Sequence, residues 1–336
     1  MNATNNCFAV LICAGIVVLS NSAGETFAEP EGSALQLEAK ISLGDVNGRI
    51  DHMSIDPNRL RLFVAELGNN SVGVVDLKER KVINVIAGLK EPQGVGYHQS
   101  TDTLYVTNAA DGSVRMFRGA DYSEVGRIDL NDDADNIRLD DVTNQIIVGY
   151  GNGALAVIDP VSRSKIADIP LKAHPEGFQL DAKGHQIFVN VPEANAVSVI
   201  DRGTGQQTAN WPTTDARGNF PMMIDEASSQ VVVAFRKPAK LRAYSMQTGK
   251  TVNELEICGD SDDVFLDAKR KRLYVSCGGG FIDVIDTSGS YKRLARIPTA
   301  QGARTSLFVP ELDRLFLAVR ASSGERPAVL IYRPVE

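Results

Sequence analysis

A unit of about 42 residues recurs seven times in this sequence, from Arg49 to the C-terminus. Each unit contains one triplet of aliphatic or aromatic residues, and the central residues of the triplets are Phe63, Tyr105, Ile147, Phe188, Val232, Tyr274 and Phe316. Successive centres are 42, 42, 41, 44, 42 and 42 residues apart. A period of 40–45 residues, made of short strands and turns without a helical pattern, predicts β-propeller blades of four strands each. The seven units therefore predict seven blades within one domain.

The two ends of the repeat region complete each other. The last unit has its first three strands but reaches Glu336 before a fourth. The segment 34–43 alternates apolar residues at Leu35, Leu37, Ala39 and Ile41, and it can supply the missing strand. Such closure removes the unpaired edges of an open array of sheets. We expect an all-β fold, a seven-bladed β-propeller of four-stranded antiparallel blades, with the ring closed by an N-terminal strand (about 34–43) that completes the C-terminal blade.

One column of the repeat ends the first strand of each unit. It holds Asp56, His98, Asp140, Asp181, Asp225 and Asp267. Asp and Asn at such positions accept hydrogen bonds from turn amides, so we interpret the aspartates as turn caps rather than catalytic groups. His98 shares the column and is predicted to be a surface turn residue, not a ligand.

The N-terminal residues predict the cellular location of the protein. An uninterrupted run of twelve apolar residues, Phe8 to Leu19, is too short to span a bilayer and fits a secretory signal peptide. We expect residues 1–28 to be removed, by cleavage after Ala28 or after Ala23, and residues 29–336 to form the propeller in the periplasm or outside the cell. Lipidation at Cys13 is disfavoured because Ile12 is bulky. An uncleaved anchor is the other alternative, and no transmembrane segment is expected after signal removal.

The predicted removal of residues 1–28 decides which cysteines remain in the mature protein. Cys7 and Cys13 lie in the segment that would be removed, which leaves Cys258 and Cys277. In an exported protein these two are predicted to form a disulfide, since both end strands on the same face of neighbouring blades. Two separate buried thiols, or a copper-binding pair, are the alternatives.

The net charge argues against one class of partner. The whole chain carries −7, and removing residues 1–28 deletes Glu25 and no base, so the mature chain carries −7 + 1 = −6. Binding to nucleic acid rests on clustered Lys and Arg, so nucleic acid is an unlikely partner.

A family resemblance rests on two short segments. Tyr105-Val106-Thr107-Asn108, followed by Asp111-Gly112-Ser113-Val114, resembles the signature of the YVTN-repeat (YncE-like) β-propellers. The similarity extends over the repeat region, where other units match the signature less closely, for example at Phe188-Val189-Asn190. It implies the propeller fold and the role of an exported binding protein. A DNA-binding role is attached to some relatives, and the acidity of this chain disfavours it.

A second column of the repeat holds residues of mixed chemistry. Counting back twelve residues from each triplet centre gives Asp51, Gln93, Asp135, Glu176, Phe220, Asp262 and Arg304, which we call the mouth residues. Loops that enter the innermost strands converge at one end of a propeller channel, so these side chains are expected to meet there. Packing alone would favour one residue type in this column. Near them in sequence lie Arg49, His52, Asp133, Asn136, His174, Arg217, Asn219, Asp260, Asp263 and Thr305.

Three interpretations of this mouth remain open. It can be a pocket for a small anionic or sugar-like ligand, with Arg49, Arg217 and Arg304 as donors and Phe220 as an apolar wall. It can hold a divalent cation such as calcium or magnesium, bound by Asp51, Asp135, Glu176 and Asp262 with His52 or His174. It can also be a solvated rim whose salt bridges lock the blades together.

Catalytic motifs bear on whether this chain is an enzyme. The sequence has no Gly-x-Ser-x-Gly elbow and no glycine-rich phosphate loop before a helix. A lactonase-like or lyase-like propeller uses a histidine as general acid or base, beside an arginine or a divalent metal that stabilises the anion formed. His52 with Arg49, or His174 with Glu176, could fill that role. The leading prediction is a monomeric exported protein that binds a small ligand or another exported protein at the mouth, without catalysis.

Overall fold

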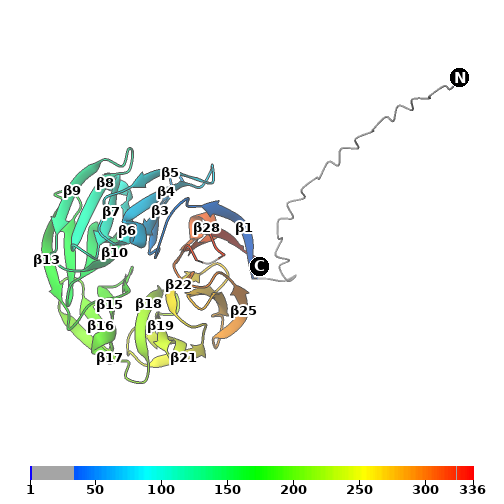
Figure 1. The fold of residues 1–336 in the computed structure, drawn as a ribbon. Coiled ribbons are helices and arrows are strands. Elements are labelled where there is room, and N and C mark those ends of the chain that lie inside the picture. The colour runs from blue at the N-terminus through cyan, green and yellow to red at the C-terminus, as the bar shows by residue number, and fades with distance from the viewer. Residues whose placement is uncertain (2–33, 323) are drawn as a thin grey trace. The chain divides into compact units, whose positions relative to one another are not determined.

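The computed structural model describes residues 1, 34–322 and 324–336, and the signal-peptide prediction lies outside them except for Met1. The described residues from Ala34 to Glu336 belong to one compact unit. Its strands form seven four-stranded antiparallel sheets, which confirms the seven-bladed propeller (Figure 1). None of the helices in the described residues has the length and hydrophobicity needed to cross a bilayer.

Within each blade the strands below run from the innermost to the outermost. The first four blades are β2 (Met53–Asp56), β3 (Arg61–Glu66), β4 (Ser71–Asp76), β5 (Lys81–Ile86); β6 (Pro92–His98), β7 (Thr103–Asn108), β8 (Ser113–Arg118), β9 (Glu124–Asp129); β10 (Ala134–Asp140), β11 (Gln145–Tyr150), β12 (Ala154–Asp159), β13 (Ser164–Pro170); and β14 (Phe178–Leu180), β15 (Gln186–Val191), β16 (Ala196–Asp201), β17 (Gln207–Pro212).

The remaining three blades close the ring. They are β18 (Arg217–Asp225), β19 (Gln230–Lys237), β20 (Ala239–Ser245), β21 (Thr251–Glu256); β22 (Ser261–Asp267), β23 (Arg272–Cys277), β24 (Phe281–Asp286), β25 (Lys292–Pro298); and β26 (Ser306–Val309), β27 (Arg314–Val319), β28 (Ala328–Pro334), β1 (Leu35–Ser42). Short 3-10 helices in the described part are η1 (Leu67–Asn69), η2 (Gln99–Thr101), η3 (Pro192–Ala194) and η4 (Pro310–Leu312).

The last blade joins the two ends of the repeat region, as the sequence predicts. Strand β1 pairs antiparallel with β28, in a register that sets Leu35 opposite Pro334 and Ser42 opposite Ala328. Figure 1 shows the blue strand β1 beside β28 at the end of the ribbon. The innermost strands of neighbouring blades are in contact all round the ring, including β2 with β26. Strand β1 therefore covers the edge of β28 and completes the last blade.

The core lies between the blades. All seven triplet centres are buried on the second strand of their blade, for example Phe63 and Tyr105 at 0% exposure. One apolar cluster combines Met53 and Val64 of the first blade with Phe316 and Ile331 of the last. The β-branched and aromatic residues of the repeat thus fill the interface between adjacent sheets, which fixes the orientation of every innermost strand.

The turn column behaves as predicted at its aspartates. Asp56 Oδ1 accepts hydrogen bonds from the amides of Asn58 and Arg59, at 3.0 and 3.2 Å. Asp140, Asp181 and Asp225 cap their turns in the same way. These carboxylates are therefore structural.

His98 corrects one expectation, because it is buried rather than on the surface. Its Nδ1 lies 2.8 Å from Thr101 Oγ1, and its Nε2 lies 3.0 Å from Asn144 Oδ1 in the turn of the next blade. Contact with the neighbouring blade, which a column of one repeat does not reveal, accounts for the burial. His98 remains a structural residue.

Candidate functional site

All seven mouth residues line one polar cavity of about 290 Å³. Six further residues predicted for the site also line it, namely Arg49, His52, Asp133, Asn136, His174 and Asp263. Arg217, also predicted as a donor, is exposed at the start of β18 and is not a lining residue of this cavity in the described chain. The cavity also includes seven residues that the sequence did not assign to the site, namely Gly177, Gln179, Pro221, Met222, Arg236, Val264 and Phe265.

The mouth residues converge because each lies within or just before an innermost strand. Gln93 lies in β6, whereas Glu176 precedes β14 by two residues. Strand β10 carries an irregularity in its pairing with β11, between Ala134 and Ile137. A β-bulge interrupts the normal alternation of side chains and re-aims them. Asp135 and Asn136, although consecutive, both line the cavity as a result.

The repeat motif itself holds the mouth in place. Thr107, fully buried, accepts a hydrogen bond from the Gly94 amide at 2.8 Å, and its hydroxyl donates to the Asp135 carbonyl of the next blade. Asn190, two residues after its triplet centre like Thr107, donates from Nδ2 to the Phe220 carbonyl at 3.0 Å. The polar residue that follows the triplet therefore fixes the backbone of a mouth residue in the neighbouring blade.

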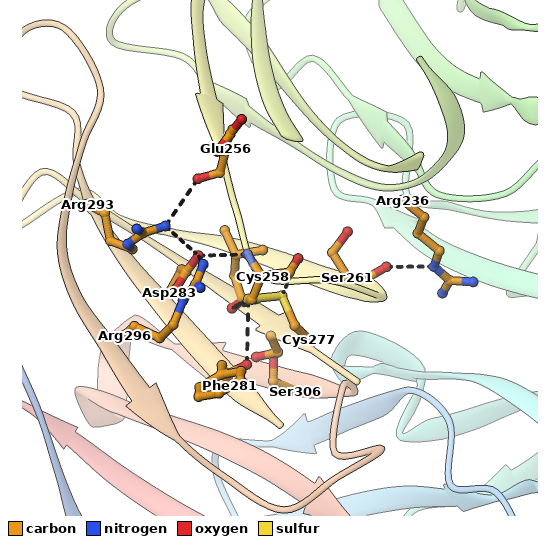
Figure 2. Close-up of a disulfide and its surroundings, with 12 residues drawn as sticks. Arg236, Glu256, Cys258, Ser261, Cys277, Phe281, Asp283, Arg293, Arg296 and Ser306 are labelled. Carbon is orange, nitrogen blue, oxygen red and sulfur yellow. Dashed lines mark hydrogen bonds and ion pairs between the residues drawn. A yellow bond between two sulfur atoms is a disulfide. The ribbon is translucent and has the colours of Figure 1, made fainter. Parts of the chain in front are cut away.

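A disulfide fixes another part of the mouth. Cys258 follows β21 and is bonded to Cys277 at the end of β23, with Cα atoms 5.8 Å apart (Figure 2). The Cys258 amide also donates to the fully buried Asp283 at 2.8 Å, and Arg296 binds the same carboxylate. Closing a loop of about 20 residues stabilises a fold by about 3 kcal/mol in chain-entropy terms. The segment that leads to Asp262 is therefore anchored from both sides.

One side of the cavity holds arginines that already have carboxylate partners. Arg49 donates to Asp51 at 2.6 Å. Arg304 binds Asp260 at 2.8 Å and Asp262 at 2.8 Å. Each guanidinium is thus oriented by its partner, and this side carries little net charge.

Arg236 belongs to the same side and was missed by the sequence analysis. It binds Asp262 and the Ser261 carbonyl, the latter at 3.0 Å and visible in Figure 2, and it lies over the Phe220 ring at 3.9 Å. It stands four residues after the triplet centre Val232. Most units have a small or apolar residue in that column, Leu67, Ala109, Gly151, Pro192 and Gly278. The last unit has Arg320 in this column, exposed and outside the cavity, so arginine at this position was a signal shared by two units.

The opposite side has an excess of acids, which we call the acidic side: Asp133, Asp135, His174 and Glu176. One ligand atom from each of Asp135, His174 and Glu176 can be chosen so that all lie within 4.8 Å of one another. His174 Nε2 is 3.8 Å from Asp135 Oδ2, and its Nδ1 is 2.7 Å from the Gly151 carbonyl. A carbonyl oxygen can only accept, so Nδ1 carries the hydrogen and Nε2 faces the carboxylates.

His52 lies between two carboxyl groups of the same cavity. Its Nε2 is 3.7 Å from Asp51 and its Nδ1 is 3.9 Å from Asp263. Asp263 is held by the Ser306 amide, which donates to it at 2.7 Å. This arrangement places one imidazole within reach of two buried acids from different blades.

Burial changes the acid–base behaviour of these groups. Desolvation raises the pKa of Asp263 to about 7 and that of Glu176 to about 7, against the opposing effects of His52 and His174 respectively. It raises the pKa of Asp51 to about 6, despite His52 and Arg49. Burial disfavours the imidazolium of His174, but Asp135 and the Gly151 carbonyl raise its pKa to about 9. Groups that titrate near neutral pH are typical of binding and catalytic sites.

The charges decide which ligands suit the cavity. Of the lining residues described, six are acids (Asp51, Asp133, Asp135, Glu176, Asp262 and Asp263) and three are arginines. A fully anionic ligand would have to displace the Arg–Asp pairs and approach this excess of acids. Hydroxyl donors and cations match the free carboxylate oxygens better.

Comparisons with known proteins identify the fold. No family model matches the chain, and no curated protein does. Among solved structures, a chain of the hydrazine synthase of Kuenenia stuttgartiensis has a TM-score of 0.76 at 18% identity, over 88% of this chain and 99% of that chain. A chain of the mitotic checkpoint complex has a TM-score of 0.77 at 14% identity, over 96% and 99%. At such identities the likeness concerns the propeller fold alone.

Proposed function

We propose that this chain is an exported, YVTN-type binding propeller whose channel mouth takes a small hydroxyl-rich, sugar-like ligand. The observation that carries the proposal is the convergence of seven side chains of four chemical kinds (acid, amide, aromatic ring and guanidinium), one from each blade, on one cavity. Packing would favour one residue type at equivalent positions of the ring. The variety is what recognition of one asymmetric small molecule requires.

The lining offers the contacts that a hydroxylated ligand uses. Carboxylate oxygens of Asp51 and Glu176 can accept from hydroxyls, and the amides of Gln93 and Gln179 can both donate and accept. Phe220 supplies an apolar wall, steadied by the guanidinium of Arg236. The cavity, about 290 Å³, is close to the lower end of the roughly 300–1,000 Å³ of small-molecule sites.

Export is supported by two independent features. The apolar run Phe8–Leu19 fits a signal peptide, and disulfides such as Cys258–Cys277 persist in oxidising compartments. The resemblance of Tyr105-Val106-Thr107-Asn108 to the YVTN repeat points the same way. The intact mass of the secreted protein tests this part, since it should correspond to a chain that begins after Ala28 or Ala23.

A binding screen tests the proposed function. Neutral sugars, amino sugars and uronic acids are titrated calorimetrically into the mature protein, with a chelator present so that metal ions play no part. A bound ligand should lose affinity by roughly tenfold or more in Gln93→Leu, because a lost hydrogen bond to a buried partner costs about 1–3 kcal/mol. Arg217→Ala, a change outside the cavity, is the matched control and should bind normally.

Two results would contradict the proposal. If none of the sugars binds, or if Gln93→Leu binds as well as the wild type, the cavity is not their site. A protein partner recruited by the propeller surface would then be the better explanation.

Hydrolysis or elimination on a sugar-derived lactone is the second candidate function. It is favoured by His52, which lies beside Asp263, a buried carboxyl with a pKa of about 7. Such a pair can exchange a proton with a substrate at neutral pH. Turnover of lactones that disappears in His52→Ala would support catalysis, and absence of turnover with intact binding would exclude it for those substrates.

A further inference from the structure

We infer that Asp135, His174 and Glu176 form a site for one first-row divalent transition-metal ion, of which Mn²⁺ and Zn²⁺ are the representatives to test. The site lies within the same cavity but goes beyond the proposed ligand function. It needs no organic ligand, so the two can fail separately.

The spacing of the three side chains suits one ion. Ligand atoms at about 2.0–2.2 Å from a metal are at most about 4.4 Å apart. The three groups offer atoms within 4.8 Å of one another. Small side-chain rotations would therefore complete the coordination without a change in the backbone.

His174 is oriented as a metal ligand. Its Nδ1–H donates to the Gly151 carbonyl at 2.7 Å, which leaves Nε2 directed toward the Asp135 carboxylate, 3.8 Å away. Metal-binding histidines almost always donate their other ring N–H to a carbonyl, a carboxylate or water, and this fixes the ring and its tautomer. The Gly151 carbonyl performs that role here.

Asn136 supplies an independent observation that points to a ligand. Its side chain is only 4% exposed and lines the same cavity beside Asp135, and its Oδ1 has no hydrogen-bond partner within the described chain. A buried acceptor without a partner costs about 1–3 kcal/mol, so such atoms are rare unless an ion or an ordered water satisfies them. Rotation of this amide toward the cavity would let a bound cation, or a water of its shell, satisfy the oxygen.

Charge compensation gives the third argument. The arginines of the cavity pair with Asp51, Asp260 and Asp262, on the other side. For Asp133, Asp135 and Glu176, the ion pairs found in the described residues amount to the single contact of Asp135 with His174. Asp135 is buried, and Asp133 and Glu176 are half-buried. Carboxylates that are withdrawn from water without compensating charge are costly, and a divalent cation would compensate two of them.

The ligand types select the class of metal. Calcium and magnesium, which the sequence left open as one interpretation of the mouth, prefer all-oxygen coordination. A set of one imidazole, two carboxylates and a nearby amide oxygen suits Zn²⁺, a borderline ion that binds imidazole and carboxylate together. It also suits Mn²⁺, a harder ion that favours the carboxylate and amide oxygens and lies with Zn²⁺ in the first transition row. The imidazole therefore separates the two classes.

Calorimetric titration of the untagged, chelator-treated mature protein with Mn²⁺ or Zn²⁺ tests the inference. We expect one ion per chain, with binding weakened at least tenfold in His174→Gln and in Glu176→Gln. His185→Gln removes an exposed histidine in the turn between β14 and β15, which does not line the cavity, and should bind as the wild type does. Mg²⁺ and Ca²⁺ should bind at least tenfold more weakly than Mn²⁺.

The melting temperature of Glu176→Gln, measured with chelator, separates a metal site from a structural ion-pair cluster. A metal site without its ion gains or keeps stability when one of its crowded acids is neutralised, whereas a structural cluster loses stability. No saturable Mn²⁺ or Zn²⁺ binding in the wild type would overturn the inference. It would also be overturned if His52→Gln abolished binding while His174→Gln did not, or if Glu176→Gln lowered the melting temperature.

Discussion

At the scale of single residues, the site is governed by carboxyl groups that the fold removes from water. Asp51 and Asp263 are 1% and 8% exposed, although a carboxylate is among the most costly groups to bury. Their raised pKa values have desolvation as the largest cause. Other interactions of the folded state must outweigh the cost of burying these carboxylates. Strongly shifted pKa values of this kind are typical of functional sites.

Asp263 gives a pH prediction of definite sign. Its pKa rises from 3.8 to about 7 through burial, opposed by His52, the Ser306 amide and Arg138 and aided by Asp262. A group with a raised pKa contributes its stability fully below the unfolded value, and that contribution is lost as the pH rises through the folded value. The free energy of unfolding should therefore fall between about pH 4 and pH 8, and by less in Asp263→Asn, which stays neutral. At about 1.4 kcal/mol per pKa unit the difference is on the order of a few kcal/mol.

Urea denaturation across this pH range measures the effect. The asparagine retains an acceptor for the Ser306 amide, so the comparison isolates the charge. Parallel pH profiles for the two proteins would show that Asp263 is ionised in the folded state at all these pH values, contrary to the account.

At the scale of elements, β1 decides whether the ring closes. Ile41 is 1% exposed and opposite Val329 on β28, whereas Leu37 on the same strand is 40% exposed. Ile41→Ala should lower the free energy of unfolding by about 2–5 kcal/mol, as expected for a truncated core side chain. Leu37→Ala is the matched control and should change it by about 0.5 kcal/mol or less.

Chemical denaturation with a single probe of secondary structure is sufficient for this comparison. Equal effects of the two substitutions would mean that β1 does not contribute its buried face to the last blade. Closure by the N-terminal strand would then have to be abandoned.

Also at this scale, some site residues could be predicted and others could not. Equivalent positions of a repeat have equivalent directions, so one column was sufficient to gather Asp51, Glu176 and Arg304. Arg236 could not be predicted from the repeat because it lies on β19. This second strand has 8 residues, whereas the second strand of other blades, such as β3, has 6. Arg217 was expected at the cavity, but β18 begins with it in an exposed position. Whether such a residue lines the cavity depends on local differences between its blade and the other blades.

At the scale of the whole molecule, closure of the ring brings together residues that are far apart in the sequence. Asp51 and Arg304 are separated by most of the chain, yet they line one cavity. The 42-residue period was sufficient for the number of blades and their closure, because strand alternation and turn chemistry repeat with it. The contacts between blades, such as that of His98 with Asn144, depend on packing that a single repeat does not encode.

The most direct test of the account is a crystal structure of the mature protein soaked in Mn²⁺, with anomalous diffraction recorded to locate the ion. The account predicts an anomalous peak in the channel mouth, within about 2.0–2.3 Å of ligand atoms from Asp135, His174 and Glu176. A mouth without such a peak at saturating Mn²⁺, or a peak bound only by surface carboxylates elsewhere, would contradict it.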